Sequence, residues 1–110
     1  MYLPEPYVLS TEEIIHFKLE LLNIKEGELL VDLGCGDANA LIKASELYKT
    51  KGVGYELREE AILIAKDTIT KHQLENQITI YKASFLNADV SQADALILYL
   101  TRQSLGELSL

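Results

Sequence analysis

The chain has 110 residues, of which 48% are hydrophobic and 25% are charged, a composition typical of a folded globular protein. Its length allows one domain and leaves no room for a second. The formal net charge of −7 disfavours a nucleic-acid partner, because such binding draws its affinity from clustered Lys and Arg. A basic protein would suit this charge better as a partner.

Cysteine content and apolar runs indicate the compartment. The single cysteine, Cys35, allows no internal disulfide, and the first ten residues lack the basic and apolar segments of a secretory signal. The longest apolar run, residues 95–100, is far shorter than the roughly 20 residues that span a bilayer. We therefore expect a cytoplasmic protein with no membrane partner.

The first half of the chain begins with a helix and a short strand. Ser10 and Glu13 have the spacing of a capping box, and apolar residues recur after them at helical intervals. This pattern predicts a helix at residues 11–22. A turn follows at residues 23–27, and residues 29–31 form a short apolar strand. The chemistry is expected to begin at the carboxyl end of this strand.

The rest of the chain alternates helices with strands. A second helix begins at residue 37 and ends before Lys51, and a third covers residues 58–72. Three further strands are predicted at residues 53–56, 77–81 and 94–100. This alternation predicts an α/β fold with a doubly wound, mainly parallel sheet and helices on both faces. Ligands of such sheets bind where the winding direction reverses, which indicates the segment after the first strand.

The last two strands differ in their patterns. Residues 77–81 alternate in polarity, as an edge strand does, whereas residues 94–100 are apolar throughout and predict a strand that is covered on both faces. Only about ten residues follow, and residues 101–110 look like the start of a further helix. The single domain would thus comprise a pre-helix segment (1–10), a βαβ core (11–100) and this start of a helix. An open outer edge predicts either a truncated sheet or self-association through the fourth strand.

One motif carries the chemistry. The sequence VDLGCGDAN at residues 31–39, followed by Glu56 at the end of the next strand, resembles the cofactor signature of the class I S-adenosylmethionine methyltransferases. Gly34 and Gly36 let the backbone turn sharply and approach a ligand, and Glu56 can accept two hydrogen bonds from a ribose diol. The resemblance implies a Rossmann-like methyltransferase fold with S-adenosylmethionine as its cofactor.

A dinucleotide-binding loop is the main alternative, because it places glycines and an acid at similar spacing. Here a third glycine is missing at Asn39, and the carboxylates of Asp32 and Asp37 would repel a pyrophosphate at the helix amino terminus. The same carboxylates suit a cofactor that carries a sulfonium and an ammonium charge. The residues of this motif that we predict to bind the cofactor are Asp32, Gly34, Gly36, Asp37 and Glu56.

Two positions depart from the family pattern. Ala38 stands where the methyltransferase signature has its last glycine, and its methyl group is expected to weaken cofactor binding without abolishing it. After the third strand the family often has an acid that contacts adenine, whereas this chain has Ala83-Ser84-Phe85. The resemblance makes Ser84 a candidate to hydrogen-bond the adenine and Phe85 a candidate to stack on it.

The amino terminus shows a narrower resemblance. PYVLST at residues 6–11, followed by the first helix and VDLGCGD, resembles the archaeal protein lysine methyltransferases and the related small mitochondrial lysine methyltransferases. Leu9 replaces a second proline of that pattern. The resemblance implies that Tyr7 and Thr11 contact the methionine end of the cofactor and that a protein lysine accepts the methyl group. In that family the domain continues for several more strands, which help to form the substrate groove.

The chemistry of a lysine acceptor suggests a catalytic residue. The amine must lose its proton before it attacks, because the unperturbed pKa of lysine is about 10.4. The carboxyl end of the fourth strand should face the methyl group, so Tyr99 is the candidate catalytic residue, with Thr101 beside it. Displacement on an activated carbon depends mainly on alignment, and we expect no metal. The alternative is a non-catalytic S-adenosylmethionine-binding module or a truncated fragment, which the early end of the chain favours.

Overall fold

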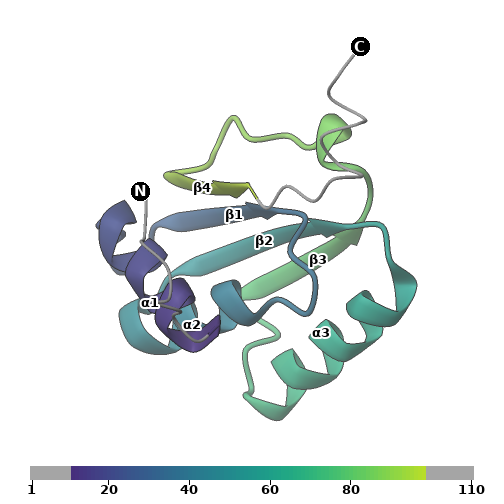
Figure 1. Ribbon diagram of the computed structural model, residues 1–110, viewed down its shortest axis with the longest axis horizontal. Coiled ribbons are helices and arrows are strands. Elements are labelled where there is room, and N and C mark those ends of the chain that lie inside the picture. Colours follow the sequence, from purple (N-terminus) through teal and green to yellow (C-terminus); the bar gives the residue numbers. More distant parts are fainter. Residues whose placement is uncertain (1–10, 99–110) are drawn as a thin grey trace, which may run out of the picture.

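A parallel sheet of four strands forms the centre of the computed structural model, which describes residues 11–98 (Figure 1). The strands are β1 (Leu29–Leu33), β2 (Lys51–Glu56), β3 (Ile78–Lys82) and β4 (Ala95–Leu98). The helices are α1 (Thr11–Leu22), α2 (Asn39–Tyr48), α3 (Glu59–Lys71) and the short 3₁₀ helix η1 (Phe85–Asn87). The predicted α/β fold with a parallel sheet is confirmed.

In the strand order β3-β2-β1-β4, the direction in which the chain winds across the sheet reverses at β1. From β1 the chain winds outward to β2 and β3, and it then returns to place β4 on the other side of β1. Val31 of β1 accordingly lies between Val53 of β2 and Leu96 of β4 in the register of the sheet. The reversal therefore occurs beside the carboxyl end of β1, as the sequence predicted for the ligand site.

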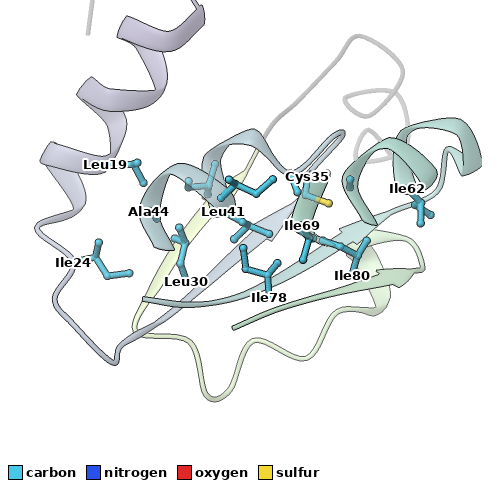
Figure 2. Packing of buried hydrophobic residues seen from close by; sticks show 14 residues of the cluster. Leu19, Ile24, Leu30, Cys35, Leu41, Ala44, Ile62, Ile69, Ile78 and Ile80 are labelled. Atoms are coloured by element: carbon cyan, nitrogen blue, oxygen red, sulfur yellow. The ribbon is translucent and has the colours of Figure 1, made fainter. Parts of the chain in front are cut away.

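The core lies between the helices and one face of the sheet. Helices α2 and α3 pack on β1, β2 and β3, and α1 packs against α2 (Figure 1). Figure 2 shows the buried apolar side chains of this layer, among them Leu30, Leu41, Ile69 and Ile78. Each such side chain contributes roughly 1.5–3 kcal/mol when it is fully buried. Leu19 of α1 belongs to the same cluster, so the first helix is anchored to the core.

The second face of the sheet differs from the expectation of helices on both faces. Within residues 11–98, all three α-helices lie on the same side of the sheet (Figure 1). Strand β3 alternates as predicted for an edge strand. The apolar strand β4 was expected to be covered on both faces, but Leu96 and Leu98 are 44% and 46% exposed while Ile97 is buried. The expectation fails because the described helices cover only the Ile97 side of the strand.

The element bounds agree closely with the sequence prediction. Helix α1 has the predicted bounds, whereas α2 begins two residues later because Ala38 still has a left-handed conformation. The pre-helix segment (1–10), the predicted end of the fourth strand and the expected helix at 101–110 lie outside the described residues. None of the helices in the part that the structure describes has the length and apolarity needed to cross a bilayer.

Candidate cofactor-binding cleft

A cleft of about 490 Å³ opens beside the carboxyl end of β1, where the strand order reverses. This volume lies within the range of roughly 300–1,000 Å³ that is usual for small-molecule sites. Four parts of the chain form its described walls: the segment from the end of β1 to the start of α2, the first part of α3 with the residue before it, one side of α1, and Ile97 of β4. The charged and polar side chains of the lining are Lys18, Asp32, Asp37, Asn39, Arg58 and Glu60.

The loop after β1 depends on its two glycines. Gly34 and Gly36 have φ values of 83° and 57°, in the left-handed region that favours glycine. The backbone N–H groups of Gly34 and Cys35 both donate to the carbonyl of Tyr55, at 2.8 and 3.0 Å. These bonds hold the loop against β2, so that the backbone of Gly34 and Gly36 lines the cleft.

Ala38, which replaces the last glycine of the signature, also has a left-handed backbone, with φ 66° and ψ 21°. Such a conformation costs an L-residue roughly 1–2 kcal/mol. Ala38 is fully buried in the apolar core and does not contribute to the described lining of the cleft. The extra methyl group therefore strains the backbone of the loop and leaves the cleft clear, and its effect on cofactor affinity stays a prediction.

Asp32 brings a buried carboxylate to the cleft. It is 4% exposed, and its Oδ1 has no hydrogen-bond partner within the described part of the chain, a situation that costs roughly 1–3 kcal/mol for a buried polar group. Burial raises the pKa of Asp32 to about 7, the Lys18 charge acts against this rise, and the charges of Glu56 and Asp37 add to it. A ligand that donates a hydrogen bond to Asp32 would supply the missing partner of Oδ1. A positive charge on that ligand would also stabilise the carboxylate form of Asp32.

Glu56, at the end of β2, binds the loop itself. Its Oε1 accepts from the N–H of Gly36 at 2.8 Å, and its Oε2 accepts from the N–H groups of Leu57 and Arg58 and from Arg58 Nε. Burial acts to raise the pKa of Glu56, but the hydrogen bonds from Arg58 and Gly36 outweigh it and hold the pKa below its usual range. A ribose diol would have to share or replace these donors, so the predicted ribose contact stays a prediction.

The structure brings together four of the predicted cofactor residues, Asp32, Gly34, Gly36 and Asp37, as lining of the cleft. Ser84 caps η1, because its Oγ accepts from the N–H of Leu86 at 3.2 Å, and its predicted contact with adenine stays a prediction. Neither Ser84 nor Phe85 contributes to the described lining.

The other predicted site residues belong to the two ends of the sequence. Thr11 is the first residue of α1, and its side chain lies outside the described part. Tyr7, Tyr99 and Thr101 also lie outside the described residues.

Sequence reasoning missed the walls that α1 and α3 provide. Ile14 and Lys18 of α1 line the cleft, as do Arg58 and Ile64 at the start of α3. The position of Arg58, two residues after Glu56 and therefore at the same edge of the sheet, was a usable signal. Lys18 gave none, because its approach to the cleft depends on how α1 packs against α2.

Cys35 packs as a buried side chain in the core. It is buried beneath the loop, with its side chain in the apolar cluster that includes Ile80 (Figure 2). Burial, together with the charges of Asp32 and Glu56, raises the pKa of its thiol to about 12. The thiolate form that reacts with electrophiles or binds metals is therefore scarce at neutral pH.

The loop of the cleft lies within a segment that matches a known protein family. A family model described as the ANTKMT methyltransferase domain matches residues 32–109, which begin at Asp32 and include the whole cofactor loop. The chain belongs to this methyltransferase family. The methyltransferase resemblance that the VDLGCGD loop and Glu56 indicated is thus confirmed.

Two curated relatives carry names that describe protein substrates. A protein-lysine N-methyltransferase of Saccharolobus islandicus (strain REY15A) is 32% identical over 101 residues, which cover 90% of this methyltransferase chain and 63% of the relative. A ribosomal protein L11 methyltransferase of Aliivibrio fischeri (strain MJ11) is 36% identical over 75 residues, or 64% of this chain and 26% of the relative. The chain therefore spans less than two thirds of either relative.

Solved structures agree with the fold. An RNA methyltransferase from Salinibacter ruber, in complex with S-adenosyl-L-homocysteine, has a TM-score of 0.82 and 26% sequence identity, with 92% of this chain and 66% of that chain covered. A SAM-dependent methyltransferase from Geobacter sulfurreducens has a TM-score of 0.62 over 68% of this chain and 30% of its own, at 17% identity, and shows the fold alone. The Rossmann-like methyltransferase fold is confirmed.

Proposed function

We propose that this chain binds S-adenosylmethionine in the cleft beside β1 and belongs to an enzyme that transfers its methyl group to protein lysines. The observation that carries the cofactor assignment is Asp32, a buried carboxylate with an unpartnered oxygen in a cleft lined by the methyltransferase loop. A cofactor with an ammonium and a sulfonium group suits this acceptor. The complex of the Salinibacter ruber enzyme with S-adenosyl-L-homocysteine supports the same cofactor class.

The residues of the cleft fit this cofactor. Asp32 would face one of its positive charges, and the backbone of Gly34 and Gly36 would allow its close approach. Ile64 and Ile97 supply apolar surface that excludes water from the bound group. When bound, the cofactor supplies an electrophilic methyl group on a positively charged sulfur, so the protein needs to hold it in alignment with the acceptor.

A protein lysine is the proposed acceptor. The names of the two curated relatives support a protein substrate, and one of them specifies lysine. The net charge of −7 favours a basic protein over RNA, although one structural relative is an RNA methyltransferase. The alternative of a non-catalytic binding module is less favoured, because residues 32–109 match the model of a methyltransferase family. The catalytic role of Tyr99 and the cytoplasmic location stay predictions.

The cofactor assignment is tested by isothermal titration of the 110-residue chain with S-adenosylmethionine and, separately, with NAD. We expect saturable binding of S-adenosylmethionine alone. Gly36→Ala should abolish it. An alanine at this position would have to keep the left-handed backbone, and its Cβ would lie 3.4 Å from Arg58 Nη2. Gly27→Ala is the matched control, because its φ of 80° imposes similar strain at a position that does not line the cleft. Binding of NAD instead would contradict the assignment.

The acceptor is tested by transfer of a labelled methyl group. The chain is incubated with labelled S-adenosylmethionine and either a mixture of basic proteins or total RNA, and labelled products are mapped by mass spectrometry. Labelled lysines are the expected result, with Gly36→Ala as the inactive control. Label in RNA alone would overturn the lysine assignment, and cofactor binding without transfer to either substrate would favour the non-catalytic module.

A further inference from the structure

Lys18 is a charged residue of the cleft that the signature does not explain. It lies one helical turn after Ile14 on the same side of α1, and both side chains line the cleft. The next residue, Leu19, is almost completely buried in the core. This packing fixes the rotation of α1, so the direction of Lys18 toward the cleft is a property of the fold.

Lys18 shares the cleft with a carboxylate of opposite charge. Asp32 lines the same cleft from the end of β1, and the Lys18 charge acts to lower the pKa of its carboxyl group. Even so, Asp32 Oδ1 has no hydrogen-bond partner among residues 11–98. The walls of the cleft therefore present a cation from α1 and an anion from β1 to one shared space.

The second cation of the described lining has a different position. Arg58 donates from Nε to Glu56 at 3.2 Å, and its Nη2 lies over the loop near Gly36. It therefore belongs to the group that joins β2 to the β1–α2 loop. Lys18 is the cation that α1 contributes to the lining, and its charge acts on the pKa of Asp32.

A cation and an anion on neighbouring walls match the two charges of an amino-acid group. Such a group carries a carboxylate and an ammonium on one carbon, and charge complementarity then allows a single orientation. On the basis of the proposed cofactor, we propose that Lys18 binds the α-carboxylate of S-adenosylmethionine while Asp32 accepts from its ammonium group. Lys18 is thus a specificity residue, which selects cofactors that retain the carboxylate.

The proposal is tested by isothermal titration with two probes that differ in this one group. S-adenosylmethionine has the α-carboxylate, whereas its decarboxylated form keeps the sulfonium and the ammonium but lacks that carboxylate. Lys18→Met keeps the length and helix propensity of the side chain. It should lower the affinity for S-adenosylmethionine about tenfold, the effect of losing one charge-assisted hydrogen bond. Binding of the decarboxylated form should change less than about twofold.

Two variants control for charge and for structure. Lys66→Met removes a positive charge from an exposed position of α3 that does not line the cleft, and it should change neither affinity. Lys18→Arg should retain most of the preference for the carboxylate, because it keeps the cation. The proposal is overturned if Lys18→Met weakens both ligands equally, which would indicate a structural effect, or if it weakens neither.

One comparison needs no variant and keeps the proposal testable if Lys18→Met fails to fold. The wild-type chain should bind S-adenosylmethionine more tightly than its decarboxylated form, and equal affinities would overturn the role of Lys18 while leaving the proposed cofactor intact. A wild-type chain that binds neither ligand would instead overturn the proposed function itself, and this inference with it. The two failures are therefore distinguishable.

Discussion

Asp32 and Glu56 are two acids at the ends of neighbouring strands with opposite electrostatic environments. Glu56 accepts hydrogen bonds from the loop and from Arg58, which hold its pKa below the usual range against the effect of burial. Asp32 is buried, none of the described residues bonds its Oδ1, and burial raises its pKa to about 7. One acid thus maintains the loop as a carboxylate, and the other remains available to a cationic ligand.

The raised pKa of Asp32 predicts a pH-dependent stability. The folded chain holds this proton more tightly than the unfolded chain, so the contribution of Asp32 to the free energy of unfolding falls as the pH rises from 3.8 to about 7. Above pH 7 the buried charge costs up to about 4 kcal/mol. Asp32→Asn should therefore be close to wild type in stability at pH 5 and more stable than wild type at pH 8, as measured by urea unfolding.

Comparing variant with wild type at each pH cancels the other titrating groups. Asp67→Asn is the control, because Asp67 is exposed on α3, does not line the cleft, and its surface ion pair with Lys71 contributes at most about 1 kcal/mol. A stability difference for Asp32→Asn that is equal at pH 5 and pH 8 would show that Asp32 has no raised pKa in the folded chain.

The sequence predicted those residues of the site whose roles are local. Gly34 and Gly36 were identified because a sharp turn after a strand needs left-handed backbone, and Asp32 because it ends that strand. Lys18 could not be predicted, since only the packing of α1 brings it to the cleft. Glu56 was identified, but the donors that surround it belong to two elements that meet only in the folded chain.

At the scale of elements, the β1–α2 loop is supported by β2. Beneath the loop the Cys35 side chain packs against Gly54, the residue that pairs with Asp32 across the sheet. A Cβ at position 54 would lie 2.6 Å from Cys35 Sγ and 2.9 Å from Ile80 Cδ1. The absence of a side chain at Gly54 therefore lets the loop lie close to the sheet.

Gly54→Ala should destabilise the chain, because overpacking of a core typically costs about 1–3 kcal/mol. Urea unfolding should show a lower midpoint. The double variant Gly54→Ala/Cys35→Ala should recover part of the loss, since it removes the sulfur that the new methyl group meets. Without such coupling between positions 35 and 54, the proposed support of the loop would be wrong.

Gly52→Ala is the matched control for this experiment. Gly52 lies two residues earlier on the same face of β2, where a Cβ would meet the flexible end of Leu41 at 3.1 Å. Its cost should be smaller than that of Gly54→Ala, and Cys35→Ala should not reduce it. Equal costs at the two positions would indicate a general intolerance of β2 to side chains.

The order of helices and strands was predictable because each element has its own period and its own breaks. The edge role of β3 followed from its alternation of Ile78 and Ile80 with polar residues. The exposure of β4 could not be predicted in the same way. An apolar pattern shows that a face can be buried, and which segment covers it depends on the whole protein.

At the scale of the whole molecule, the main unexplained surface is the face of the sheet that the helices of residues 11–98 leave uncovered. In the register, Leu98 of β4 is next to Leu33, Tyr55 and Tyr81 across the sheet, and the two tyrosine rings stack at 5.6 Å. This row points away from the side of Ile97 and Ile80, which face the helices. Its apolar surface suits a further layer of protein.

Self-association through β4 is the prediction that follows for the 110-residue chain. Burying Leu96 and Leu98 against a second copy would remove apolar surface from water and would protect the edge strand. Light scattering should therefore show a molecular mass that rises with concentration. Leu96→Lys/Leu98→Lys should shift the chain toward the monomer, because charges on an edge strand oppose pairing. Leu21→Lys/Leu63→Lys, which changes two exposed leucines of α1 and α3, should leave the association unchanged. A wild-type chain that stays monomeric at all concentrations would show that β4 does not mediate association.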